Sequence, residues 1–220
     1  MSAAMTFLLW TKGPLFALAL TIFALGLMVR LSEIFVLGRA RNHAAPRAAE
    51  WPAGLRTMLT RSLADPGTFR RAPFNVLVGW LWHIGFLVTL LLFVPHIDLI
   101  RSLTGLSWPG LPNPLISLTT AVTLVALLAT LVHRLNHPVK RRISTVEDYL
   151  VWGVVFAVVL TGFLAYYRWI HPYPLILGLH ILAAEILLVL LPFTKLTHIF
   201  TAFVARWYNG AAFGRKGVPS

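Results

Sequence analysis

Five stretches of about twenty apolar residues run through this chain and leave few folds open to it. A helix needs about 20 mostly apolar residues to cross a membrane core of about 30 Å, whereas a barrel strand needs only about 9–11. Only 12% of the residues are charged, where an average soluble domain has about a quarter. The stretches lie at about 14–37, 76–96, 114–134, 149–168 and 173–195. We therefore expect an all-α integral membrane protein, in which residues 1–220 form one five-transmembrane-helix bundle and the first span is not cleaved.

Basic residues are distributed unevenly between the connections, and this bias predicts the orientation. The loop 38–75 carries seven Lys and Arg, the connection 134–148 carries four, and the tail from Lys195 onward carries another four. Positive charge gathers on the cytoplasmic side of membrane proteins, so we expect the N-terminus outside, the C-terminus inside and a multi-pass position in the cell inner membrane. The same topology accounts for the net charge of +12, and no base-reading module accompanies it. We therefore expect no nucleic-acid partner.

The inner loop 38–75 and the basic inner tail 196–220 are the polar parts of the chain. Within the loop, Leu55, Met58, Leu59 and Leu63 recur at helical intervals. This spacing predicts an amphipathic helix that lies along the inner membrane surface. Cysteine is absent, which excludes disulfides, cysteine-ligated iron–sulfur clusters and c-type haem attachment in this chain.

Four histidines fall at two depths of the expected bundle. His83 lies near the inner end of the second span and His96 at its outer end, whereas His180 lies near the outer end of the fifth span and His198 at its inner end. Because these two spans run in opposite directions, we expect an inner pair, His83 with His198, and an outer pair, His96 with His180. Two neutral imidazoles hold haem iron for electron transfer, so the pattern predicts two haem b groups.

Other interpretations of these histidines stay open. A histidine near the end of a span often reaches the interface or bonds a backbone carbonyl, and we interpret His133, beside Arg134, in that way. The alternative for the whole chain is a haem-free transporter or scaffold whose histidines pack together or bind a metal.

Four segments carry a resemblance to a known family. Trp82-His83-Ile-Gly-Phe-Leu, Leu179-His180 and Leu191-Pro-Phe-Thr-Lys-Leu-Thr-His198-Ile, together with the connection 134–149, resemble the gamma subunit of respiratory nitrate reductase. The membrane cytochromes of heterodisulfide reductase and of the sulfite-reduction-associated complex are related to that subunit and share the pattern. The resemblance implies a dihaem cytochrome b that exchanges electrons with quinone. It also implies that His83 and His198 ligate the inner haem and that His180 ligates the outer one.

One position departs from that family. Its second ligand in the second span falls ten residues after the first, where this chain has Phe93. The nearest replacement, His96, would face about 220° away from His83 on a regular helix. A bend at Pro95 would turn His96 inward. Two haems are therefore preferred, and a single inner haem, with His180 idle or lining a quinone pocket, stays open.

Several charged residues complete the predicted site. Arg30, Arg134 and Lys195 are candidates to pair with the propionates of the inner haem, or they anchor the chain at the interface. Glu185, in the middle of the fifth span, is the candidate catalytic residue, as a relay for the protons of quinone chemistry. We expect a subunit of a respiratory oxidoreductase that transfers electrons between the quinone pool and an iron–sulfur partner on the inner face. Whether the chain is an enzyme by itself stays open.

Overall fold

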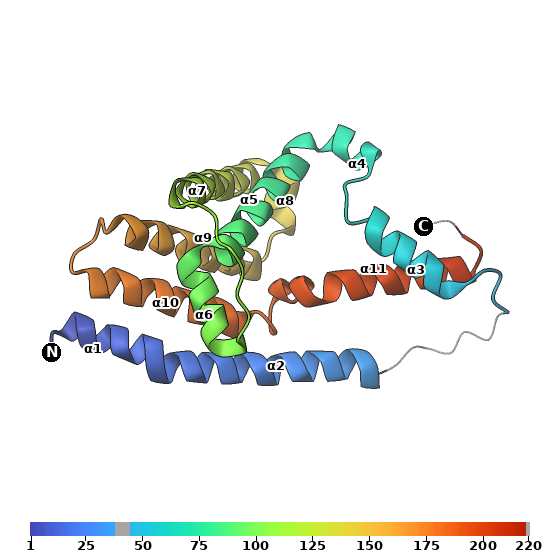
Figure 1. Ribbon diagram of the computed structural model, residues 1–220. Helices are drawn as coiled ribbons and strands as arrows, with labels where there is room; N and C mark the ends of the chain where they lie inside the picture. Colours follow the sequence, from blue (N-terminus) through green and yellow to red (C-terminus); the bar gives the residue numbers. More distant parts are fainter. Residues whose placement is uncertain (38–44, 219–220) are drawn as a thin grey trace. The chain divides into compact units, whose positions relative to one another are not determined.

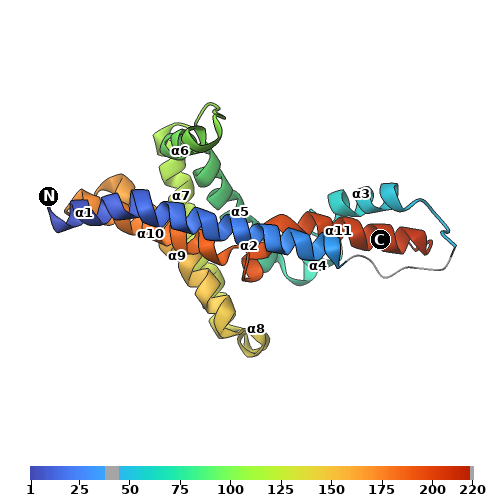
Figure 2. The ribbon, with the colours of Figure 1, turned by 90° about the horizontal axis from the view of Figure 1, so that it is seen from below.

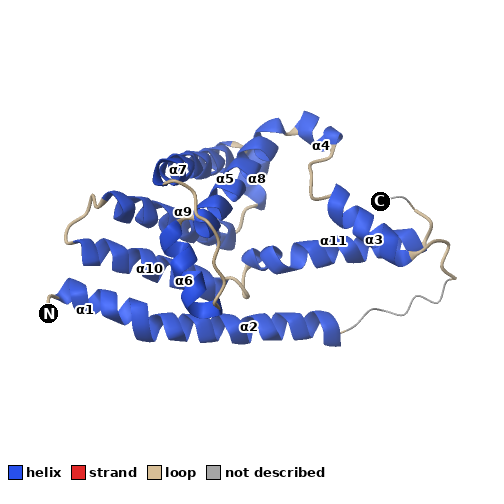
Figure 3. Ribbon diagram, viewed as in Figure 1, coloured by secondary structure: helices blue, strands red, loops and turns tan. Residues whose placement is uncertain are grey.

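The computed structural model describes residues 1–37 and 45–218 of this protein (Figure 1). The first part of the expected inner loop, residues 38–44, lies outside the described residues. Every regular element in the described part is a helix, as Figure 3 shows. The all-α class is therefore confirmed.

Five of the helices are long and apolar enough to cross a membrane. They are Ala3–Val36, Pro73–Leu92, Asn113–Asn136, Val146–Tyr167 and Tyr173–Leu190. The first runs without interruption through α1 (Ala3–Trp10), the π-helical segment η1 (Thr11–Leu15) and α2 (Phe16–Val36). Large apolar side chains on these helices are exposed, among them Leu18, Leu77 and Val125. Such a surface suits lipid rather than water, so the chain is a membrane protein with several candidate spans.

The ends of three helices differ most from the expected ones. The first begins at Ala3 rather than 14, the second, α5 (Pro73–Leu92), ends at Leu92 rather than 96, and the fifth, α10 (Tyr173–Leu190), ends at Leu190 rather than 195. Prolines explain the early ends of α5 and α10. A proline inside a helix clashes with the carbonyl four residues before it, so α5 ends before Pro95 and α10 ends before Pro192. Phe93 is extended, and α6 (Val94–Thr104) starts afresh with Pro95 in its first turn, where the missing N–H costs nothing.

The chain divides into two compact units, each of which is described by itself. The first comprises Met1–Ile22 and Phe74–Val189, and the second comprises Phe23–Pro73 and Leu190–Ser220. In the first unit α7 (Asn113–Asn136) packs against α9 (Val146–Tyr167). There the Trp152 indole donates a hydrogen bond of 2.9 Å to the carbonyl of Leu127. Glycine allows close helix approach elsewhere in the unit: Gly178 of α10 lies against Phe7 and Leu8 of α1.

In the second unit the expected loop and tail form a helix pair. α3 (Glu50–Thr60) lies beside α11 (His198–Arg215), as Figures 1 and 2 both show, and α4 (Pro66–Arg71) follows α3. A Cβ atom added at Gly210 would lie 2.3 Å from Thr57 Oγ1, so glycine is required for this close packing. Arg215 pairs with Glu50 at 2.5 Å across the two helices. The tail is therefore a helix, and α3 buries a face of small residues.

The apolar face expected on the inner loop is still exposed. Leu55, Leu59 and Leu63 are all accessible, because α3 contacts α11 through Gly54 and Thr57 instead. Their position at a membrane surface stays a prediction.

A candidate histidine-pair site

His96 and His180 face each other within the first unit. Their ring centroids are 6.1 Å apart and their planes are inclined by 25°. The helix break at Phe93 makes this possible, because α6, which carries His96, runs in a different direction from α5. On an unbroken helix His96 would face away from His83, so the predicted inward turn at Pro95 agrees with the observed geometry.

Hydrogen bonds define the tautomer of both rings. Nδ1 of His96 lies 3.0 Å from the carbonyl oxygen of Thr89, in the last turn of α5, where carbonyls are available to side chains. Nδ1 of His180 lies 3.1 Å from the carbonyl oxygen of Val158 and 3.3 Å from Oγ1 of Thr161, both on α9. A carbonyl oxygen only accepts, so each Nδ1 carries the hydrogen and each Nε2 carries the lone pair. This is the form in which histidine binds a metal.

Burial keeps His96 neutral. It lowers the pKa of the imidazole below its ordinary value of 6.5, although the hydrogen bonds to the carbonyls of Thr89 and Leu90 act in the opposite direction. The ring is therefore uncharged at pH 7, and its lone pair is available for coordination.

The separation of the rings fits a metal ion held between them. The ring centroids are 6.1 Å apart, which is close enough for both imidazoles to hold one metal ion. Within residues 1–37 and 45–218, no group of three or more His, Asp or Glu residues forms a metal site.

The residues around the His96–His180 pair lie close to the two rings. A Cβ atom added at Gly162 of α9 would lie 2.9 Å from Cε1 of His180, so this ring lies directly on the glycine. The Phe93 ring stands edge-on to His96 at 5.2 Å and contacts Tyr166 at 6.0 Å. Phe93 thus packs directly against His96.

The expected inner pair is divided between the two units. His83 of α5 is exposed, places Nδ1 2.7 Å from the carbonyl oxygen of Gly79, and stacks on Trp82 at 3.5 Å. His198, at the start of α11, is exposed and places Nδ1 2.7 Å from the carbonyl oxygen of Lys195. In both residues Nδ1 lies against a backbone carbonyl, as it does in the outer pair. Because His83 belongs to the first unit and His198 to the second, their pairing stays a prediction.

The cations predicted to bind propionates have protein contacts of their own. Arg30 donates from Nε to the carbonyl oxygen of Pro192 and from Nη1 to Glu33, both at 2.8 Å.

Arg134 donates to Oγ of Ser144 at 2.8 Å and lies 3.8 Å from Asp148. Lys195 is exposed in the short 3-10 turn η2 (Lys195–Thr197). The propionate role of these three cations stays a prediction.

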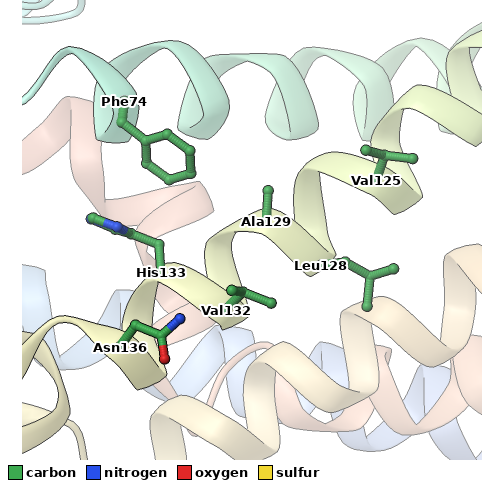
Figure 4. Close-up of a pocket in the computed structure, with 7 residues that line it drawn as sticks. All are labelled: Phe74, Val125, Leu128, Ala129, Val132, His133 and Asn136. Carbon is green, nitrogen blue, oxygen red and sulfur yellow. The ribbon is translucent and has the colours of Figure 1, made fainter.

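A groove of about 500 Å³ lies between α5 and α7 (Figure 4). His133 forms its polar end, with its ring 4.5 Å from that of Phe74 of α5. The sequence alone predicts His133 as an interfacial residue and does not point to Phe74 or Asn136. Their signal was available, because the α7 residues recur at helical intervals as one apolar stripe that ends in two polar groups. The groove is lined by Phe74, Val125, Leu128, Ala129, Val132, His133 and Asn136.

Comparison with known proteins gives a limited result. The chain is 30% identical over 149 residues to a protein of Nitratidesulfovibrio vulgaris (strain Hildenborough), and the match covers 68% of this chain. The chain spans 66% of the length of that relative, whose name, "Protein", specifies no activity. No family model matches the chain. No solved structure matches it either.

Proposed function

We propose that this chain is a b-type haem membrane subunit of a respiratory oxidoreductase, similar to the gamma subunit of nitrate reductase. It would transfer electrons between the quinone pool and an iron–sulfur subunit on the inner face. The observation that carries the proposal is the His96–His180 pair, whose rings lie 6.1 Å apart with Nδ1 bonded to carbonyls, so that both residues would hold one haem.

The pair also favours two haems over one. The single-haem alternative arose because Phe93 stands where the family has its ligand. His96 compensates for that loss, since the break at Phe93 brings it opposite His180. The outer haem would be held by these two residues, and the inner one by His83 and His198.

Haem b would supply reversible one-electron transfer between ferrous and ferric iron. The protein's part is to hold both imidazoles in one orientation. The Val158 carbonyl and Thr161 hydroxyl fix the ring of His180, the Thr89 carbonyl fixes that of His96, and Gly162 leaves room for the imidazole. Such second contacts commonly change metal affinity by about 10–100-fold when they are removed.

The groove between α5 and α7 offers a place for quinone. Val125, Leu128 and Val132 supply an apolar surface for the ring and its tail, and His133 and Asn136 supply hydrogen-bonding groups for the ring oxygens.

The basic residues of α8 (Pro138–Ile143), which follows α7, form a surface where an acidic partner would dock. Burial and the charge of Arg134 lower the pKa of Lys140 there.

The haem-free transporter or scaffold is the alternative, and a haem assay separates it from the proposal. The purified chain should contain two b-type haems per polypeptide. His96→Ala and His180→Ala should each remove one, whereas His171→Ala, at an exposed loop position, should remove none. A purified, folded chain without haem would refute the proposal. So would a haem content that neither His96→Ala nor His180→Ala changes.

A further inference from the structure

Glu185 is the most unusual side chain in the first unit. It lies in the middle of α10, only 4% of its surface is exposed, and neither carboxylate oxygen has a hydrogen-bond partner in the described part of the chain. A charged carboxylate in such a place would cost several kcal/mol or more. Something must therefore compensate its charge.

The helices around Glu185 offer no cation in the buried interior. The charged residue of η1, Lys12, is exposed. The sequence of α9 contains no charged side chain between Asp148 and Arg168, and the nearest titratable group on α10 is His180, five residues away. No metal site of three or more acidic or histidine ligands occurs among the described residues. The carboxylate thus has no side-chain partner in the described part of the chain, and a proton would remove its charge without one.

The position of Glu185 along α10 places it beside an irregular backbone segment. Gly178 contacts Phe7 and Leu8 of α1, and Glu185, seven residues or two turns further on, returns to the same face. α1 and α10 run side by side in the same direction (Figures 1 and 2). Seven residues beyond Leu8 is Leu15, so Glu185 lies level with η1, Thr11–Leu15.

η1 is the kind of backbone that a buried carboxyl can use. π-helical turns are uncommon and occur often at functional sites. Pro14 has no N–H, so one carbonyl of the preceding turn lacks its usual donor. Thr11 is fully buried and donates its hydroxyl to the carbonyl oxygen of Leu8 at 2.9 Å. A protonated carboxyl is an O–H donor, and this segment supplies acceptors at its level.

We propose that Glu185 and η1 form a proton-binding site inside the bundle, in which Glu185 is a neutral carboxylic acid that exchanges its proton. Glu185 lies on the same helix as His180. The proposal rests on the proposed function only for the physiological role of the site, which is to store protons released by quinol. Its existence does not require haem.

Labelling with dicyclohexylcarbodiimide, which attacks protonated carboxyls in apolar surroundings, tests the proposal on the full chain in detergent. At pH 7, mass spectrometry of the digested protein should find the adduct on Glu185, formed at least about tenfold faster than on the exposed Asp98. Glu185→Gln should abolish this adduct and Asp98→Asn should leave it unchanged. The infrared spectrum should contain a protonated-carboxyl band that disappears in Glu185→Gln.

Two results would overturn the proposal. The first is the absence of both the adduct and the infrared band in the wild-type chain. The second is protection of Glu185 by sodium chloride but not by choline chloride, which would make the site a sodium site. Haem content, measured on the same sample, reports separately on the proposed function, since labelling does not depend on it.

Discussion

Replacing Gly162 by alanine tests the position of His180 without removing a ligand. The new Cβ would lie 2.9 Å from Cε1 and 3.2 Å from Nδ1 of the imidazole, whereas carbon atoms ordinarily approach to about 3.5–4.0 Å. The ring would have to move by about 0.6–1.1 Å, while metal–ligand distances tolerate only about 0.2 Å. A ring forced about 30° from its rotamer costs about 0.5–1.5 kcal/mol. We therefore expect haem affinity at this site to fall about two- to thirteenfold.

The fold itself should not suffer from this substitution. Alanine is more favourable than glycine inside a helix by about 0.5–1 kcal/mol, which offsets much of the cost of turning the ring of His180. Haem titration of the purified variants measures the effect, and Gly153→Ala, on the same helix with nothing within 4 Å of its new Cβ, is the control. Equal haem affinity in the two variants would refute the position of His180 as an axial ligand.

Three further substitutions test other parts of the account. Gly210→Ala should destabilise the α3–α11 pair by about 1–3 kcal/mol, because its Cβ would lie 2.3 Å from Thr57 Oγ1; faster limited proteolysis of α3 would show this, and unchanged proteolysis would contradict it. His133→Leu should raise the KM for a quinol about two- to thirteenfold through one lost hydrogen bond, and an unchanged KM would remove the groove from the mechanism. His83→Ala should lower the haem content by one, and a full haem content would exclude it as a ligand.

The membrane class was readable from the sequence because it depends on length and polarity alone. Twenty apolar residues in a row form a helix in lipid, since only helices and closed barrels satisfy the backbone there and a barrel strand is about half as long. The structure agrees, with five candidate spans over the expected stretches. The exact ends of the helices were harder to predict, because they depend on local breaks such as those before Pro95 and at Leu190.

The outer histidine pair was only partly predictable. Regular helix geometry turns His96 away from His83 by about 220°, and the sequence offered Pro95 as one reason for a bend. The amount of the bend depends on how α6 packs after the break and on which carbonyl receives Nδ1. These contacts join residues on different helices, so no local pattern contains them.

The α3–α11 pair was missed for a different reason. Hydrophobic periodicity finds faces made of large apolar residues, and it led to Leu55 and Leu59. The buried face is instead made of Gly54, Thr57 and Gly210, whose small size allows close approach and gives no hydropathy signal. The length and basic charge of the C-terminal segment likewise suggested a tail rather than a helix.

Electron paramagnetic resonance of the oxidised protein would test the central claim most directly. Two histidine ligands on one iron would give low-spin ferric haem. We predict one low-spin signal that disappears in both His96→Ala and His180→Ala. A chain without any low-spin signal, or one whose signals all survive His96→Ala, would contradict the assignment of these two residues to one iron.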